Sequence, residues 1–379
     1  MPYRIKLPNI FCIILLLTAY SYSGRALYGI LLIFSVYAFL KSLKIKSDDL
    51  AVSCMLLAFI LIATLLSVLS GKNVMGITYT IMIFIPAYMF ILKKSLYSSK
   101  KLVIALFTLF IIFSDVVTIF QFLVQGYNRQ EIKIIGASVN YLAALNNLYF
   151  IMAYDFLLEQ TKQNLLLRIG VSISTLFILL SLSRVSLAML ILNICAILLI
   201  KLFNSHQKEK LLLLLKTLVV LIVSVLIITI IYKYSYKNSA GFYSSINSFK
   251  HYFKNIKTLG VGGSRAILWK TTIEELKNNI FIGANTFLVN DNGNLSPPHN
   301  FIMEILLLNG LFGMAAYIIS VMYIFKKLCL KNINKKVLLI IICFNYWGIC
   351  LLHPFLTTSY LYNIMMGYGL LCINDTAKK

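Results

Sequence analysis

Residues 167–203 read LRIGVSISTLFILLSLSRVSLAMLILNICAILLIKLF, an apolar run that only Ser183 and Arg184 interrupt near its middle. A single helix of this length, at about 1.5 Å per residue, would be nearly twice as long as the apolar core of a bilayer is thick. Two helices of bilayer length, joined by a tight turn at Ser183–Arg184, fit the run better. The stretch therefore predicts a helical hairpin that crosses a membrane twice.

The composition of the whole chain indicates the same class of protein. Of its 379 residues, 60% are hydrophobic and 12% are charged, whereas soluble globular domains are about 45–50% apolar and about 25% charged. A soluble enzyme, a disordered protein and a disulfide-rich secreted domain are therefore excluded, and a helical membrane protein remains. The seven Cys residues lie in apolar segments or short basic loops, which predicts buried thiols rather than a disulfide framework.

The apolar stretches predict an all-α fold: a polytopic integral membrane protein with about twelve transmembrane helices and one long outer loop. The argument that splits residues 167–203 also splits the chain near Ser23–Arg25 and at His353–Pro354. We expect about nine helices in residues 1–232, the long loop in 233–300 and about three helices in 301–379. The expected spans are residues 10–23, 26–40, 50–70, 74–92, 102–124, 139–158, 167–183, 185–203, 211–232, 301–325, 337–352 and 355–373.

The formal net charge of +23 fits this topology. With both termini placed inside, Lys and Arg in the inner segments outnumber those in the short outer loops by about four to one, as the positive-inside rule requires. The long outer loop is exempt from that rule. The basic charge is therefore explained by orientation in the membrane, and we expect no nucleic-acid partner.

Residues 233–300 form the only sizeable polar region of the chain. A polar insert of this size on one side of a membrane suggests a site that faces that compartment. Ser264 is expected to cap an amphipathic helix over residues 264–278. Arg265 and Trp269 lie one turn apart on that helix.

His299 stands where the long loop ends. Residues 297–300, Pro-Pro-His-Asn, lead directly into the expected span 301–325, which places His299 at the N-terminus of a helix on the outer surface. The helix dipole there disfavours the protonated imidazolium, and a neutral imidazole is what a general base needs. The alternative interpretation is a polar cap at the membrane surface.

Three further residues of span 301–325 suggest a role in packing or in function. Gly310 and Gly313 lie too far along the helix to reach His299, and their spacing predicts a close-packing face. Glu304 is an acid within a span, which is functional by default, although its shallow position also fits a solvated rim.

Three arginines are candidates for holding an anion: Arg184 between two spans, Arg265 at the start of the amphipathic helix, and Arg129 in the outer loop 125–138. Together they could bind a diphosphate through bidentate contacts. The alternative interpretations are that the side chain of Arg184 snorkels to the membrane surface and that Arg265 is only solvated. Nothing in the spacing brings the three arginines together. The His residues are scattered and no outer Asp-x-Asp occurs, so we expect no metal and no cofactor.

Three stretches resemble the O-antigen polymerase/ligase family, which includes Wzy-type polymerases and WaaL-type ligases. The first is LSLSR at 180–184, and the second is RAILWKTTIEELKNNIFIG at 265–283. The third, His299-Asn300 followed by nine residues and Gly310-Leu-Phe-Gly313, is similar to the family's HN-x9-GxxG signature. The resemblance covers roughly residues 130–325.

The resemblance implies a glycosyltransferase of the bacterial inner membrane whose active site faces the periplasm. Its donor would be an oligosaccharide on undecaprenyl diphosphate. Arg184 and Arg265 would bind the donor diphosphate, with Arg129 a weaker candidate for the same anion site, and His299 would activate the acceptor hydroxyl. The implied partners are the lipid-linked oligosaccharide, membrane lipid and a chain-length regulator (a polysaccharide copolymerase).

Three functions stay open at this point. The favoured one is an O-antigen polymerase that joins repeat units, and the alternative is an O-antigen ligase that transfers polysaccharide to lipid A core. Both use the same donor chemistry and differ in the acceptor. A polysaccharide flippase or other transporter would need ionisable residues deep within the spans. The chain has few of these: Asp115, Asp155, Lys216 and Glu304.

Overall fold

The fold is described from a computed structural model of the chain. The residues that it describes are 24–43, 47–69, 75–92, 100–125, 138–159, 164–181, 183–204, 264–284, 287–289, 295–328, 333–351, 353 and 360–374. The elements are α2 (Gly24–Ser42), α3 (Ser47–Leu69), α4 (Met75–Ile91), α6 (Lys100–Leu123), α7 (Val139–Glu159), α8 (Leu165–Ser181), α9 (Arg184–Asn204), α12 (Ser264–Asn279), β1 (Leu288–Val289), β2 (Leu295–Ser296), α13 (Phe301–Lys327), α14 (Ile333–Cys350) and α16 (Tyr360–Ile373).

Ten of the twelve expected spans coincide with one of these helices, and the other two, 10–23 and 211–232, lie outside the described residues. The predicted break in residues 167–203 is confirmed, because α8 ends at Ser181 and α9 begins at Arg184. Among the described residues, three helices are long and apolar enough to cross a membrane: Asp48–Leu65, Leu102–Leu123 and Phe301–Lys327. The total of twelve spans stays a prediction.

One small element departs from the all-α expectation. Strands β1 and β2 pair antiparallel, with Leu288 opposite Ser296 and Val289 opposite Leu295. Each strand has two residues, which is too short for an alternating apolar pattern to be recognised in the sequence. The pair lies between α12 and α13 in the chain.

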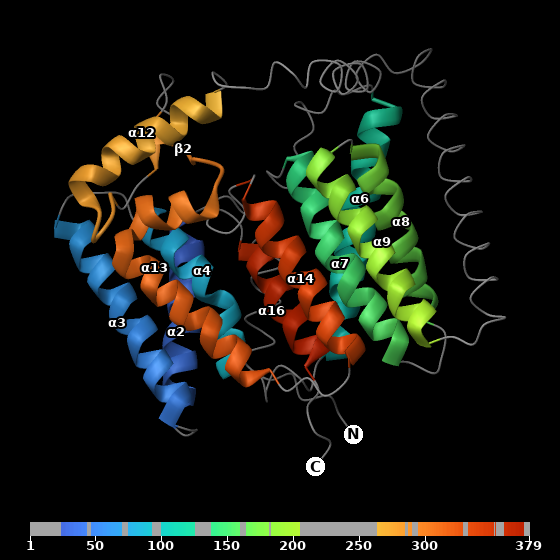
Figure 1. The fold of residues 1–379 in the computed structure, drawn as a ribbon, viewed down its shortest axis with the longest axis horizontal. Helices are drawn as coiled ribbons and strands as arrows, with labels where there is room; N and C mark the ends of the chain where they lie inside the picture. Colours follow the sequence, from blue (N-terminus) through green and yellow to red (C-terminus); the bar gives the residue numbers. More distant parts are fainter. Residues whose placement is uncertain are drawn as a thin grey trace. The chain divides into compact units, whose positions relative to one another are not determined.

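The chain divides into two compact units. The first contains Met1–Val103, Gly260–Lys331 and Tyr346–Lys379, and the second contains Ile104–Leu259 and Asn332–Asn345. In the first unit, α2, α3, α13 and α16 all pack against α4 (Figure 1). Residues 80–91 of α4 are buried without a break, as expected for a helix that is apolar all round. The predicted division at 232 and 300 stays a prediction.

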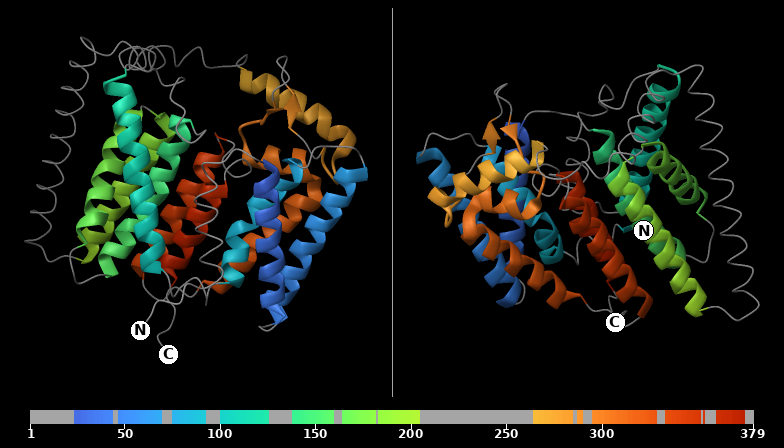
Figure 2. Two further views of the ribbon diagram at one scale, coloured as in Figure 1. Left: turned by 180° about the vertical axis from the view of Figure 1, so that it is seen from behind. Right: turned by 45° about the horizontal axis from the view of Figure 1, so that its top comes forward.

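Helix α12 differs from its neighbours in orientation. It lies across one end of the helices of the first unit, whereas α3 and α13 run side by side (Figure 2). At the other end of α13, Lys327 pairs with Asp49 at the start of α3, with Nζ and Oδ1 2.5 Å apart. Both side chains are largely shielded from solvent. The two ends of α13 are thus fixed by different partners.

In the second unit, α7 packs against α8 and α9 and its residues 142–153 are all buried. Tyr149 on α7 donates a hydrogen bond to Thr108 Oγ1 on α6 over 3.0 Å. A side chain at Gly170 of α8 would collide with this pair. The absence of a Cβ at Gly170 therefore lets three helices meet closely around a polar contact.

Candidate functional site

His299 occupies an unusual backbone position immediately before α13. Its φ is 56°, in the left-handed region that few residues other than glycine adopt. The side chain is half-buried, and its Nδ1 atom is shielded from solvent. Such a backbone geometry costs about 1–3 kcal/mol and persists only where the surroundings impose it. The contacts on either side of His299 therefore determine where its imidazole lies.

Asn300, rather than His299, caps α13. Its Oδ1 accepts hydrogen bonds from the backbone N–H groups of Ile302, over 3.0 Å, and Met303, over 3.4 Å. Asn is among the best N-cap residues because it satisfies these otherwise unpaired N–H groups. His299 thus lies one residue outside the cap, and the interpretation of His299 as a capping residue is wrong.

Helix α12 is fixed to the residue that precedes His299. The indole Nε1 of Trp269 donates a hydrogen bond to the carbonyl oxygen of Pro298 over 2.7 Å. The predicted amphipathic helix is confirmed, because Trp269, Thr272 and Leu276 are partly or fully buried while their neighbours Lys270, Glu274 and Glu275 are exposed. One face of α12 therefore packs on the segment that carries His299.

Helix α13 is broken at Gly310. This residue has φ 62° and ψ −162°, so the chain continues as a second helix from Leu311. A break of this kind leaves N–H and C=O groups without helical partners, which is tolerated at membrane depth only where other groups satisfy them. The predicted continuous span 301–325 is therefore wrong at this position, since glycine allows a conformation that pattern analysis does not reveal.

The turn that follows α12 supplies the missing partners. Ala284 donates its N–H to the carbonyl of Leu307 over 2.6 Å, while the N–H groups of Leu311 and Phe312 donate to Ile280 and Phe281 over 2.9 and 3.2 Å. We name residues 280–284 the closing turn. The closing turn thus satisfies backbone groups on both sides of the break in α13.

Two glycines allow this close approach of backbone to backbone. Gly283 has φ 79°, and a Cβ there would lie 2.5 Å from the backbone nitrogen of Asn309. A Cβ at Gly310 would collide with the backbone of Phe281. The expected close packing is confirmed at Gly313, where a Cβ would collide with Asn309, whereas Gly310 serves as the break itself.

Asn309 lies at the level of the break and is 3% exposed. Its Oδ1 accepts a hydrogen bond from Thr80 Oγ1 of α4 over 2.6 Å, and its Nδ2 group is buried without a hydrogen-bond partner among the described residues. Glu304, one turn into the helix, is fully buried, so the interpretation of Glu304 as part of a solvated rim is wrong.

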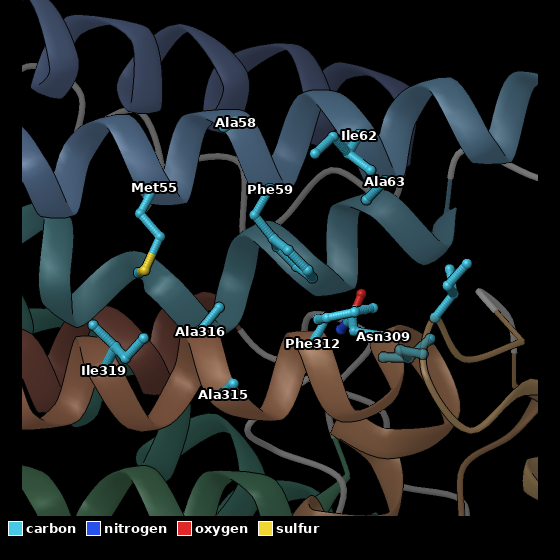
Figure 3. Close-up of a pocket in the computed structure, with 12 residues that line it drawn as sticks. Met55, Ala58, Phe59, Ile62, Ala63, Asn309, Phe312, Ala315, Ala316 and Ile319 are labelled. Atoms are coloured by element: carbon cyan, nitrogen blue, oxygen red, sulfur yellow. The ribbon is translucent and has the colours of Figure 1, made fainter.

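An apolar groove runs from the break along α3 and α13. It has a volume of ≈ 510 Å³, and Asn309 contributes the polar lining (Figure 3). Asn309 and Phe312 lie toward one end, and Met55 and Ile319 lie toward the other. Ile62 and Phe312 in its walls are more than half exposed, which is typical of side chains that contact lipid.

The three candidate arginines lie in different places. Arg265 is the second residue of α12, in the same unit as His299, and Arg184 is the first residue of α9, in the other unit. The side chains of both, and the whole of Arg129, lie outside the described residues. The structure therefore brings the helix of Arg265 and the His299 segment together, and the convergence of the three arginines stays a prediction.

Residues 169–318 match the model of a protein family described as O-antigen ligase. The match covers less than half of the chain, and this region therefore resembles the O-antigen polymerase/ligase family. The matched region contains Arg184, Arg265, His299 and the broken helix, whereas Arg129 precedes it. Comparisons with curated proteins and with solved structures gave no match.

The apolar helices indicate a membrane protein, and the matched region is similar to a family described as O-antigen ligase. Within the described residues, no group of three His, Cys, Asp or Glu side chains is arranged to hold a metal ion.

Two features of the candidate site were not predicted from the sequence. Trp269 was noted only for its spacing from Arg265, and its bond to Pro298 has no local signal because the partners are 29 residues apart. Asn309 lies next to Gly310 in the signature that the sequence resembles. The presence of an Asn in an apolar span does not indicate that its hydrogen-bond partner is Thr80, which is 229 residues away in the chain. Both residues are recognised only once the helices are packed.

Proposed function

We propose that the protein is an O-antigen polymerase. It joins oligosaccharide repeat units carried on undecaprenyl diphosphate, at the periplasmic face of the bacterial inner membrane, with its termini in the cytoplasm. The observation that supports this most strongly is the fixed position of His299, which Trp269 of α12 and the Asn300 cap hold from both sides.

In the proposed reaction, His299 is the general base. Its imidazole accepts the proton of the acceptor hydroxyl as that oxygen bonds to the anomeric carbon of the donor. The bond between that carbon and the phosphate oxygen breaks, and undecaprenyl diphosphate leaves. A positioned base of this kind contributes about 10²–10⁴ in rate. Because Nδ1 is shielded, we assign proton transfer to Nε2.

The arginines neutralise the leaving diphosphate. Arg265 lies four residues before Trp269, so helical spacing places the two positions on the same stripe of α12. Arg184 and Arg129 complete the anion site in this proposal. Guanidinium groups bind phosphate oxygens in a bidentate manner and stabilise developing negative charge without a metal.

An O-antigen ligase is the second candidate, because that is the description of the matching family model. It would use the same donor and the same residues, with lipid A core as acceptor. A chain-length regulator is a proposed partner of the polymerase only.

The surface lipopolysaccharide of a strain that lacks this gene tests the proposal. Core with a single repeat unit is the result expected for a polymerase. Bare core, with polymer accumulating on the lipid carrier, would identify a ligase. An unchanged ladder would contradict both functions.

Variants expressed in the deletion strain test the site. His299→Ala should abolish the restored polymer while the amount of protein in the membrane stays unchanged. Arg265→Lys keeps the charge and loses the planar fork, so we expect at least a tenfold loss of polymer. Normal polymer from His299→Ala would contradict the general-base assignment, and normal polymer from Arg265→Lys would contradict bidentate binding.

A further inference from the structure

The interior of the second unit is unusually polar for a membrane-spanning bundle. Two adjacent amides of α7 point to different partners: Asn146 bonds to Asp115 of α6, and Asn147 bonds to the backbone of Ser186 in α9. Asn193 of α9 continues the second chain of amides, through Asn147, to Asn345. All of these side chains are at most 1% exposed. Asp115 is the ionisable member of this network, and the proposed function does not use it.

Asp115 lies within the apolar window Leu102–Leu123 of α6 and is fully buried. Its Oδ1 accepts a hydrogen bond from Asn146 Nδ2 over 3.0 Å. Its Oδ2 is buried without a hydrogen-bond partner among the described residues, and so is Oδ1 of Asn146. One carboxyl oxygen and one amide oxygen therefore lie in the interior with no hydrogen bond from a described residue.

Among the described residues, the polar groups around the pair carry no positive charge, although the Ser114 side chain lies within hydrogen-bonding reach of the Asp115 carboxyl. Ser114 and Thr118 donate their hydroxyl protons to backbone carbonyls of α6 itself, and Ser174 of α8 donates to the backbone oxygen of Asn146. No salt bridge to Asp115 occurs among the described residues. A bare carboxylate in such an interior is strongly unfavourable, so the site must carry a positive charge or a proton.

We propose that Asp115 and Asn146 form a binding site for a monovalent cation, H⁺ or Na⁺, inside the membrane-spanning part of the second unit. A proton bound to Asp115 gives the carboxyl a donor and removes its charge. A sodium ion would instead take both buried oxygens as ligands, and the hydroxyl oxygens of Ser114 and Thr118 are the next oxygens along α6.

Labelling with dicyclohexylcarbodiimide tests the site in the purified full-length protein. This reagent adds to a carboxylic acid, not to a carboxylate: the acid proton moves to a nitrogen of the reagent as the carboxyl oxygen bonds to its central carbon. We expect an adduct on Asp115 in sodium-free buffer, detected by mass spectrometry of the peptide. Asp49, which pairs with Lys327, is the internal control and should stay unlabelled.

The two cations are separated by adding NaCl. If Na⁺ binds, labelling of Asp115 slows at least fivefold in NaCl relative to choline chloride. If the ligand is a proton alone, the two salts give the same rate. The Asp115→Asn variant should give no adduct at this position in either salt.

Thermal unfolding in detergent gives a second, independent measurement. In sodium-free buffer, loss of the bound proton as the pH rises leaves a buried charge, so the unfolding midpoint of the wild type should fall between neutral and alkaline pH. The midpoint of Asp115→Asn should fall less. Among the described residues, Tyr149 of α7 is the titratable side chain that interacts electrostatically with Asp115, and Tyr149→Phe controls for its contribution.

Either a labelled Asp115 or a pH response that depends on Asp115 supports the site. No adduct on Asp115 in either salt, together with equal pH responses of wild type and Asp115→Asn, would overturn it. Neither measurement depends on transferase activity, so the outcome is separate from the test of the proposed function.

Discussion

At the scale of single residues, the position of His299 is the most informative feature of the molecule. Trp269 holds the carbonyl before it, and Asn300 caps the helix after it. These contacts hold His299 in a left-handed backbone conformation that would be unfavourable without them. A base that must meet a hydroxyl proton within hydrogen-bond distance depends on such support. Trp269 is thus a positioning residue for His299.

Replacing Trp269 by Phe keeps an aromatic ring and removes the indole N–H. We expect kcat of the purified transferase to fall about five- to tenfold with KM nearly unchanged, because a lost hydrogen bond of about 1 kcal/mol loosens the base and not the substrate site. Steady-state kinetics with a lipid-linked donor give both constants.

The other Trp of the chain provides a matched control. Trp347 donates its indole N–H to the hydroxyl of Tyr317 over 2.6 Å and is also half-buried. Trp347→Phe should keep kcat within about twofold of the wild type. Equal losses of kcat in both variants would mean that Trp269 acts only through general stability.

The sequence identifies the individual residues of this site better than it identifies their contacts. His299, Arg265 and Trp269 stand out from their residue types and spacing. The bond from Trp269 to Pro298 and the backbone conformation of His299 depend on how α12 packs, which no local pattern encodes. The same reason leaves the meeting of Arg184 with Arg265 as a prediction.

At the scale of elements, α13 consists of two helices joined at Gly310. The second, from Leu311 to Lys327, has 17 residues, or about 25 Å of helix, which is close to the thickness of a bilayer core. Ile280, Phe281 and Ile282 of the closing turn are about half exposed or more. The exposure of these apolar side chains is consistent with a closing turn that contacts lipid.

Gly310→Ala tests the break directly. The alanine would have to hold a positive φ and would collide with Phe281, so we expect a loss of stability on the order of 3 kcal/mol. Chemical or thermal unfolding in detergent measures this loss. The purified variant should also bind or turn over its donor poorly, because the break sets the direction of the first half of α13.

Gly29→Ala is the control for that substitution. Gly29 lies inside α2, and an added Cβ there has nothing within 4 Å. Alanine favours a helix over glycine by about 1 kcal/mol, so this variant should be as stable as the wild type or slightly more stable. A Gly310→Ala protein as stable as Gly29→Ala would contradict the broken helix.

The order of the helices was predictable, and the break was not. Apolar runs of bilayer length and the Ser183–Arg184 interruption place ten helices correctly, because a helix that crosses a bilayer needs a long apolar stretch that is easy to recognise. Gly310 sits in an equally apolar run. Its conformation is imposed by hydrogen bonds from residues 280–284, which the pattern of residues 301–325 does not contain.

At the scale of the whole molecule, the charges at the ends of α13 set its direction. Lys326 and Lys327 are at its C-terminal end, where they pair with Asp48 and Asp49, and the positive-inside rule assigns this end to the cytoplasm. The opposite end, which carries His299, is the end that the proposed function places at the periplasmic face.

Cysteine labelling in whole cells tests this orientation. In a variant whose native Cys residues are replaced, a single Cys at Lys270 of α12, which is exposed, should react with a membrane-impermeant maleimide. A single Cys at Lys326, also exposed, should react only after the cells are opened. The reverse pattern would place the proposed site on the cytoplasmic side and contradict the periplasmic reaction.

The closing turn also constrains how the protein is made. Residues 280–284 precede α13 in the chain, so their carbonyl and N–H groups already exist when the ribosome releases residues 301–327. If α13 entered the bilayer first, it would have to insert as one unbroken helix or expose unpaired backbone groups at several kcal/mol each. Delivery of the closing turn to the lipid boundary before α13 leaves the translocon would avoid both of these outcomes. Slow synonymous codons between residues 284 and 301 would favour that order of events.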